Sequence, residues 1–377
     1  MQFRIIKLPN KVAVAAGVTA EWEAPSTGYL AGVLFLGTAS TVTASTYTQE
    51  TWRPHDLIDP IQVTLNESFN VVSATARQLI SREYWNTGLS DIARHRMYTT
   101  GTTRLCIPVS FGKYMFDPFH AINLSMVDSC KVKLSNSMSA STFTSPAIDC
   151  FGIFIEDPNV GKMNAGFMRF EEYREWTTTQ AGVEYINLPH DGKLRKVYFQ
   201  MIPDLTSSKG DADPHDNMRN IKYTIDSGSK VLYDDQSFYL SHLATYQAGQ
   251  EAVFHGMKDT TADNGIITGL LRQTGYSGIS MSIDAAVSAN VPTIGDDSYY
   301  AINPEDREAD SPIALIVRGL GCESMIQYSH DNYGDGSDYL DLHSHTDVML
   351  EVSTRDAATA ADGTNRIVIE RYWERYP

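Results

Sequence analysis

The sequence predicts an all-β protein built from two similar β-sandwiches in tandem. Segments with period-two hydrophobicity recur along the whole chain, and three pairs of segments repeat between the halves in the same order. Ordered internal repeats favour duplication of a complete domain, because each half must then form a unit of the same kind. The length of 377 residues also exceeds what one hydrophobic core usually serves, so two domains are expected.

The three repeat pairs differ in their spacing. PSTGYLAGVLF from residue 25 matches PHDGKLRKVYF from residue 189, an offset of 164 residues. IQVTLNESFNVV from residue 61 matches IKYTIDSGSKVL from residue 221 (offset 160), and LSMVDSCKVKLS from residue 124 matches LHSHTDVMLEVS from residue 342 (offset 218). The 58-residue increase between the last two offsets predicts an insertion between Leu232 and Leu342. We expect this insertion to form loops or a small tower at one end of the second sandwich.

The expected strands are half-buried, with apolar residues on alternate positions. The segments VTAEWEAP, IQVTL, KVKLS and RIVIERYW show this alternation most clearly. Between such segments lie clusters of Gly, Pro, Asp, Asn and Ser, such as APSTG, LPHDG and IDSGS, which favour turns. Regular alternation of strands and turns is typical of β-sandwiches.

Two windows have helical periodicity. Residues 71–85 (VVSATARQLISREYW) place Ala74, Leu79 and Ile80 on one side, and residues 236–247 (QSFYLSHLATYQ) in the second half have a similar character. We therefore expect each half to contain a strand, a tight turn and then a short helix.

The domain boundary is expected after the strand-like segment IDCFGIFIEDP. Residues 167–182 (FMRFEEYREWTTTQAG) are interpreted as a short helix followed by a polar tether. The prediction is a first domain over 1–165, a linker over 166–180 and a second domain over 181–377. The second domain is expected to carry a long loop insertion within about 250–338, which is rich in Gly, Asp and Ser.

Composition and charge argue against several classes of function. The net charge of −16 argues against direct nucleic-acid packaging, which needs clustered Lys and Arg to neutralise phosphates, and it suits a protein that stays soluble before it associates. The longest apolar run, YLAGVLFLGTA, is too short to span a bilayer, and the first residues do not predict a secretory signal. The irregularly spaced cysteines are expected to be reduced, buried thiols rather than a disulfide framework: Cys106, Cys130, Cys150 and Cys322.

Several segments resemble one known family. IQVTLNESFNVVSATARQLI and IKYTIDSGSKVLYDDQSFYLSHL each lead from a strand through a polar turn to a short helix, and in this they resemble the major capsid proteins of the double jelly-roll virus lineage. Residues 103–137 are similar to that lineage's strand with an Ile-Pro step, connecting loop and two further strands. The resemblance covers most of both halves. The chain departs from many relatives in lacking a basic or amphipathic N-terminal arm, which leaves its attachment to an inner membrane or scaffold open.

The resemblance implies two tandem eight-stranded jelly rolls, standing side by side in an icosahedral shell. Three chains then present six similar domains, so a homotrimer would fill a pseudo-hexagonal tile. The implied partners are neighbouring capsomers and minor capsid or penton proteins, without sequence-specific nucleic-acid binding, and the resemblance leaves open whether an internal lipid membrane is also a partner. The expected location is the virion, after synthesis in the host cytoplasm.

Two clusters were weighed as metal sites. His343 and His345 alternate on a strand as in a cupin, but Glu351 follows too late and no further histidine comes after it. The segment DNYGDGSDYLD is rich in the oxygen ligands that calcium prefers, yet it fails the EF-hand pattern at its third and twelfth positions. A solvated acidic loop is the preferred interpretation of its carboxylates: Asp331, Asp335, Asp338 and Asp341.

Other chemistry has weaker support. Cys322 lies eight residues before His330, but a thiol nucleophile needs a positioned base and an oxyanion site, which spacing does not supply. The five scattered tryptophans are expected in the core or at interfaces rather than on a sugar: Trp22, Trp52, Trp85, Trp176 and Trp373. The sequence has no P-loop, no G-x-S-x-G and no dinucleotide fingerprint.

The sequence therefore favours a structural major capsid protein with no catalytic residue, cofactor or metal. The alternative is a two-domain jelly-roll glycan-processing enzyme or carbohydrate-binding protein, which would typically be secreted and carry a signal segment or disulfides. A bicupin is a third hypothesis, disfavoured by the incomplete metal spacing.

Overall fold

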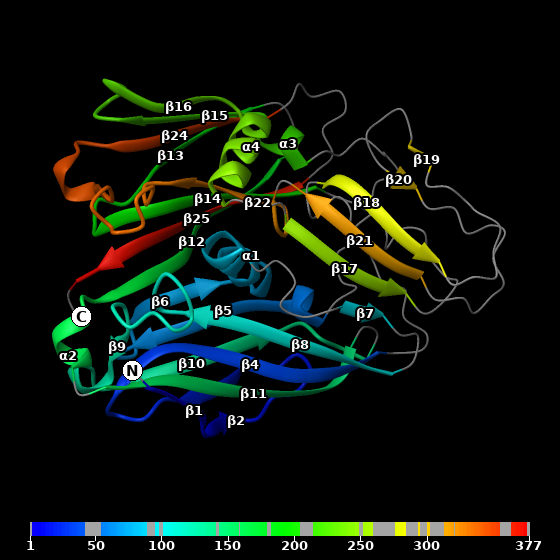
Figure 1. The fold of residues 1–377 in the computed structure, drawn as a ribbon, viewed down its shortest axis with the longest axis vertical. Coiled ribbons are helices and arrows are strands. Elements are labelled where there is room, and N and C mark those ends of the chain that lie inside the picture. Colours follow the sequence, from blue (N-terminus) through cyan, green and yellow to red (C-terminus); the bar gives the residue numbers. More distant parts are fainter. Residues whose placement is uncertain are drawn as a thin grey trace.

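The computed structural model describes residues 2–41, 54–88, 95–97, 101–140, 143–157, 159–178, 182–203, 214–248, 252–258, 276–283, 293–294, 300–301, 313–319, 321–354 and 363–374. Figure 1 shows two sandwiches stacked along the long axis, with helix α1 between them in the middle of the molecule. The predicted all-β fold with short helices is confirmed.

Each half supplies eight main strands. Those of the first half are β1 (Gln2–Lys7), β3 (Ala20–Glu23), β4 (Tyr29–Thr41), β5 (Ile58–Leu65), β6 (Phe69–Ala74), β8 (Gly101–Ser110), β10 (Cys130–Asn136) and β11 (Phe143–Glu156). Those of the second half are β12 (Phe167–Thr178), β13 (Val183–Asn187), β14 (Lys193–Pro203), β15 (Asn220–Ile225), β16 (Lys230–Gln236), β22 (Met325–Ser329), β24 (Val348–Ser353) and β25 (Gly363–Trp373).

Short elements connect the main strands. The helices are α1 (Ala76–Thr87), α2 (Val160–Met163), α3 (Pro214–Asn217) and α4 (Ser237–Ala248), with 3-10 turns η1 (Pro54–Leu57), η2 (Leu124–Met126) and η3 (Leu342–Ser344). The minor strands are β2 (Asn10–Val12), β7 (His95–Met97), β9 (Ile122–Asn123), β17 (Ala252–Lys258), β18 (Tyr276–Ile283), β19 (Thr293–Ile294), β20 (Tyr300–Ala301), β21 (Ile313–Gly319) and β23 (Leu340–Asp341).

The two halves have the same strand order. In the first half, β1-β11-β4-β8 pack against β3-β10-β5-β6, and in the second half β12-β25-β14-β22 pack against β13-β24-β15-β16. The two middle layers join into one ten-stranded sheet, because β6 pairs in parallel with β12. Duplication of an eight-stranded sandwich explains why the order repeats strand by strand.

The register of the strands confirms the repeat offsets. Ile61 of β5 lies opposite Leu134 of β10, and Ile221 of β15 lies opposite Val352 of β24, so the offsets of 160 and 218 hold on both sides of the pair. The turns repeat as well. Asn66 accepts a hydrogen bond from the Asp128 backbone N–H at 2.8 Å, and the equivalent Asp226 accepts one from the Thr346 N–H at 3.0 Å.

The core of each sandwich follows the predicted alternation. Phe35 in β4 and its repeat partner Phe199 in β14 are both fully buried. Trp22 meets Phe35 edge-on at 5.5 Å between ring centroids in the first half. Strands that present one apolar face to the opposite sheet account for this pattern.

The prediction of a linker helix was wrong. Residues 167–178 form β12, which pairs with β25 over its whole length and takes the place that β1 has beside β11. Met168 and Phe170, two positions apart, are both fully buried and flank the half-buried Arg169, which fits a strand beside β25 better than an exposed tether. The division at 165 and 181 into domains remains a prediction.

The helical window 71–85 also begins later than predicted. Residues 69–74 form strand β6, and α1 starts at Ala76, because Thr75 caps it: its side chain accepts from the Gln78 N–H while the Gln78 side chain accepts from the Thr75 N–H. Gly88 ends the helix in the left-handed conformation. This capping box and glycine stop are sequence signals for a helix that starts after the β-branched pair of valines.

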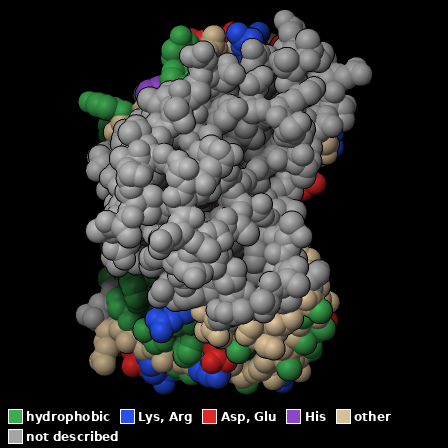
Figure 2. Space-filling model, turned by 90° about the vertical axis from the view of Figure 1, so that its right-hand side faces the viewer, with side chains coloured by type: hydrophobic (Ala, Val, Ile, Leu, Met, Phe, Trp, Pro, Cys, Tyr) green, Lys and Arg blue, Asp and Glu red, His purple; other side chains and the backbone are tan. Residues whose placement is uncertain are grey.

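The range 250–338 is not a continuous loop. It contains β22, a main strand of the second sandwich, and β17, β18 and β21, which form a separate four-stranded sheet with β7. β7 follows α1 in the first half, and β17 follows α4 in the second half. In both halves, the segment after the helix therefore contributes a strand to this sheet. In Figure 1 it lies to one side of the sandwiches, away from both termini. Figure 2 looks onto that side, and the described side chains at its lower end mix apolar, basic and acidic types.

Candidate assembly interface

Helix α1 packs between the two sandwiches and, together with the parallel β6–β12 pair, joins them. All of its residues from Ala76 to Trp85 are buried, including those that the helical pattern assigned to a polar side. Leu79 and Ile80, which the helical pattern places on one side, are both buried in the hydrophobic core. The other side of α1 packs on the second half, so this helix has no solvent-facing stripe over those residues.

Polar contacts join α1 to the strands of the second half. Gln78 donates from Nε2 to Glu172 at 2.7 Å and to Gln200 at 3.0 Å. About two helical turns further along, Trp85 donates from Nε1 to the Met325 carbonyl oxygen at 3.0 Å. Ser81 donates to the Cys322 carbonyl oxygen at 2.8 Å. These bonds satisfy buried polar groups on both sides and fix the orientation of one sandwich on the other.

A buried charge network lies at the centre of this interface. Arg82 of α1 donates from Nε to Glu370 of β25 at 3.0 Å and from Nη1 to the Ser110 carbonyl oxygen at 2.6 Å. Glu370 also accepts from Arg195 Nη1 and Tyr198 Oη, both at 3.0 Å. Burial alone would raise the pKa of Glu370, but Arg82, Arg195 and Lys196 outweigh it and lower that pKa to about 2. The carboxylate is therefore ionised at neutral pH.

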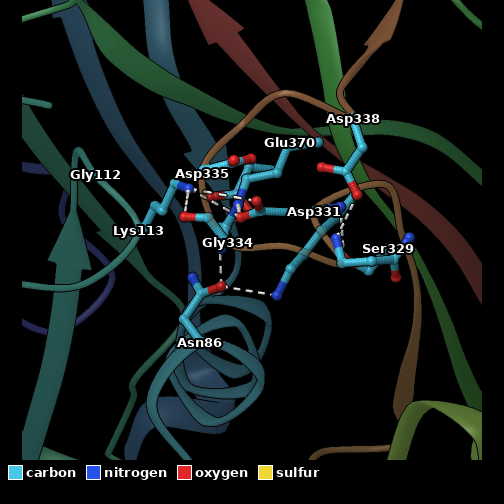
Figure 3. A network of polar contacts seen from close by, with 12 residues as sticks. Asn86, Gly112, Lys113, Ser329, Asp331, Gly334, Asp335, Asp338 and Glu370 are labelled. Atoms are coloured by element: carbon cyan, nitrogen blue, oxygen red, sulfur yellow. Dashed lines mark hydrogen bonds and ion pairs between the residues drawn. The ribbon is translucent and has the colours of Figure 1, made fainter. Parts of the chain in front are cut away.

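The network extends to the acidic loop that was weighed as a calcium site. Asp331 accepts from Arg195 Nε at 2.8 Å and pairs with Lys113 Nζ at 3.3 Å (Figure 3). Burial would raise the pKa of Asp331, yet Arg195 and Lys113 hold it below its usual value. Lys113 also donates to the Gly334 carbonyl oxygen at 2.6 Å, which ties this loop to the first half.

The remaining carboxylates of that loop hold local turns. Asp338 accepts from the Asn332 N–H at 2.7 Å, Asp335 from the Ser337 N–H at 2.9 Å, and Asp341 from the His343 N–H at 3.1 Å, where it caps η3. Within the described part of the chain, no three His, Cys, Asp or Glu residues gather as metal ligands.

The two histidines of HSH lie in separate contacts. His343 accepts from the Gly192 N–H at 3.4 Å, whereas Nδ1 of His345 lies 3.0 Å from Asp226. Glu351 lies on β24 opposite Tyr185 and Lys222. His345 thus stabilises the turn at Asp226 in the second half.

Cys322 and His330 flank strand β22. His330 is buried, and its Nε2 lies 3.0 Å from Tyr223 Oη. Burial lowers the pKa of His330 to about 4. All four cysteines are thiols; three are buried as predicted and Cys106 is half-buried.

The tryptophans occupy core and interface positions. Trp22 lies in the first core, and Trp85 lies at the contact between the halves. Trp176 and Trp373 are half-buried against the core. Trp52 lies outside the described residues.

One cavity of about 480 Å³ lies where end loops of the two halves meet. Its lining combines aromatic and charged side chains: Lys113, Tyr114, Asp117, Phe119, His120, Lys193, Tyr339 and Tyr372 among others. His120 Nδ1 lies 2.8 Å from Asp117, and Lys193 pairs with Glu374 at 2.7 Å. Asp117 and His120 thus pair within the cavity, whereas Lys193 pairs with a residue outside its lining.

Sequence reasoning missed the interface between the halves. The local signal was weak, because Arg82 shares its helical window with other polar residues such as Arg77 and Glu83, although Glu370 directly follows the apolar run 367–369. Charges at such positions are found buried only when they are paired. No described helix has the length and apolar character needed to span a membrane.

Solved structures share this architecture over nearly the whole chain. The STIV MCP matches with a TM-score of 0.60 at 10% identity, over 100% of this chain and 98% of that one. This decides the fold. It is a double jelly roll. The major capsid protein P2 from Bacteriophage PM2 matches with a TM-score of 0.51 at 11% identity over 99% of both chains.

A third double jelly roll, from the PBCV-1 virus capsid, matches with a TM-score of 0.55 at 9% identity, over 98% of this chain and 93% of that one. No family model matches the sequence. No curated protein matches it either. The double jelly roll is thus supported by structure at identities where the sequences have diverged almost completely.

Proposed function

We propose that this protein is a structural major capsid protein. The observation that carries the proposal is the match to capsid proteins over at least 98% of the chain in three solved structures. Both jelly rolls match over nearly their whole length, and no large domain is left unmatched. This favours a capsid role, which is the role that the matched proteins are named for. Fold alone does not fix function, so the surfaces of this chain must support assembly as well.

The proposed assembly unit is a homotrimer that forms a pseudo-hexagonal capsomer. Each chain contributes two sandwiches with the same strand order, so three chains present six similar units around one axis. The rigid contact through α1 supports this role, because a tile needs its two sandwiches at a fixed angle. Such capsomers would tile an icosahedral shell.

The proposed partners are neighbouring capsomers, minor capsid or penton proteins and an internal lipid membrane. The net charge of −16 favours protein partners over sequence-specific nucleic-acid contacts. We place the mature protein in the virion, after synthesis in the host cytoplasm.

The alternative of a glycan-processing enzyme or carbohydrate-binding protein rests on the cavity beside Tyr339. Its acid and base, Asp117 and His120, already contact each other. The other residues weighed for chemistry, among them Asp331 and His345, hold structural contacts as well. Because these side chains are engaged in structural contacts, a non-enzymatic role is favoured.

Negative-stain imaging of the purified full chain tests the proposal. The capsid role predicts hexagonal tiles or closed shells at high protein concentration. Dispersed single particles at every concentration, together with binding of glycans in the cavity, would support the alternative.

A further inference from the structure

Helices α1 and α4 are repeats with different surroundings. Both have 12 residues and follow the same strand of their sandwich, and Leu79 and Leu240 occupy equivalent buried positions against their own halves. The outer side of α1 is covered by the second sandwich. The outer side of α4 has no such cover within the described chain, and Figure 1 shows this helix near the top of the molecule.

The outer side of α4 carries an apolar stripe, which we call the α4 stripe: Tyr239, Leu243 and Tyr246. These side chains are 53%, 45% and 87% exposed. Aligned from the first helical residue, they are equivalent to Gln78, Arg82 and Trp85, which are at most 5% exposed because the second sandwich covers them. Three large apolar side chains at helical spacing are typical of a surface that becomes covered.

The face that receives α1 also has a repeat. In the second half it is the outer side of β14, β22 and β25, and its equivalent is the outer side of β4, β8 and β11. We call this surface the β4 face: Leu34, Leu36, Cys106 and Phe151. Leu36 is 40% exposed, and the other three are half-buried.

A residue pair that joins α1 to the second sandwich is replaced on both sides at the equivalent positions of α4 and the β4 face. Gln78 and Gln200 share a hydrogen bond of 3.0 Å between the halves, and their equivalents are Tyr239 and Leu36. Both amides are thus replaced by large apolar side chains, one on each free surface. This joint replacement maintains complementarity between the helix and the sheet face.

The second contact repeats in the same way. Trp85 donates to the Met325 carbonyl oxygen. The equivalent of Trp85 is Tyr246 on α4. The equivalent of Met325 is Cys106 on the β4 face, because Cys106 pairs with Leu36 in the same way that Met325 pairs with Gln200. Tyr246 carries a hydroxyl that can donate at this place.

We propose that the α4 stripe of one chain packs on the β4 face of a second copy of the same chain. The contact continues, between chains, the interface that α1 makes within the chain. Each chain offers one stripe and one face, so the contact is head-to-tail and closes into a ring when the rotation allows it. The inference rests on the proposed homotrimer and specifies which surfaces form it.

The test uses single substitutions in the full chain and measures mass by light scattering. Tyr246→Glu and Tyr239→Glu place a charge in the proposed contact, and Leu36→Lys does so from the other side. Tyr333→Glu is the matched control, because Tyr333 is 81% exposed and belongs to neither surface. Each interface variant is expected to weaken association at least about 30-fold, whereas the control keeps the wild-type association.

The double variant Tyr239→Glu with Leu36→Lys tests the pairing directly. Because these positions are equivalent to the bonded Gln78 and Gln200, the opposite charges are expected to restore much of the association lost in either single variant. Circular dichroism and thermal unfolding of each variant check that the fold is intact.

Two outcomes separate this inference from the proposed function. If the wild-type chain forms trimers and the stripe variants form them equally well, the trimer stands and the α4 contact is refuted. If the wild-type chain stays a monomer under all conditions, the proposed capsomer fails and this inference fails with it.

Discussion

Arg82 in the first sandwich and Glu370 in the second form a buried ion pair, with Arg82 Nε 3.0 Å from Glu370 Oε1. Their side chains are 1% and 0% exposed. Arg195 and Tyr198 donate to the other carboxylate oxygen, so two arginines and a tyrosine share one acceptor group. This ion pair connects helix α1 of the first sandwich to β25 of the second.

Replacement of Glu370 by Gln should destabilise the protein strongly. The change leaves Arg82 buried without its counter-charge and removes one of the two carboxylates that pair with Arg195, which typically costs about 3–5 kcal/mol. Urea unfolding at pH 7 measures the loss. Glu156→Gln is the control, because Glu156 pairs with Arg4 at the surface and such exposed pairs contribute about 0–1 kcal/mol. Equal small losses in both variants would contradict the central role of Glu370.

Stability should fall as the pH decreases from about 6.5 to about 4, because of His330. Burial lowers the pKa of His330 to about 4, whereas the histidine of the unfolded chain titrates near its ordinary value of about 6.5. Between these values the unfolded chain binds a proton that the folded chain does not, so acid favours unfolding. The effect from pH 7 to pH 5 is about 2 kcal/mol.

The variant His330→Gln isolates this contribution. It keeps a polar side chain beside Tyr223 but does not titrate, so its free energy of unfolding should depend less on pH over this range. An identical pH dependence in the wild type and the variant would show that other groups cause the acid sensitivity. Glu370 adds its own loss of stability only at lower pH, between about 4.5 and 2, since its folded pKa is lowered.

Gly166→Ala should destabilise more than Gly228→Ala. Both glycines have positive φ, +136° and +78°, so alanine strains the backbone at each. A Cβ at Gly166 would also collide with the Trp373 carbonyl oxygen, whereas a Cβ at Gly228 meets no atom within 4 Å. Thermal unfolding of both variants measures the difference, and equal melting temperatures would refute the clash.

Chelation of metal ions should leave the melting temperature unchanged. The carboxylates of the 331–341 loop accept hydrogen bonds from backbone N–H groups and pair with Lys113 and Arg195. One oxygen, Oδ1 of Asp338, has no hydrogen-bond partner among the described residues, but a single oxygen does not form a cation site. Calorimetry with and without EDTA measures this. A large fall in melting temperature, with stoichiometric zinc or calcium in elemental analysis, would show that a metal is bound after all.

The sequence predicted the architecture better than the contacts between its parts. Period-two strands and the ordered repeats gave two sandwiches, since alternation and duplication are local and visible. β12 was missed because its charged residues resemble a helix or tether, and only its pairing with β25 shows it to be a strand. The acidic loop was interpreted as solvated, but the Asp331 side chain is 3% exposed and forms salt bridges with Lys113 and Arg195, which lie far from it in the chain.

Association should strengthen as salt increases. Each chain carries a net charge of −16, so assembly brings like charges together, and screening over about 8 Å at physiological ionic strength reduces this repulsion while apolar contacts persist. Sedimentation at low and high salt measures the trend. Dissociation by salt would indicate that ion pairs between chains dominate instead.

The mass of the purified full chain in solution tests the capsomer most directly. Light scattering over a series of protein and salt concentrations is expected to converge on three times the chain mass of 41.9 kDa. A particle that keeps the mass of a single chain at every concentration and salt would contradict the account.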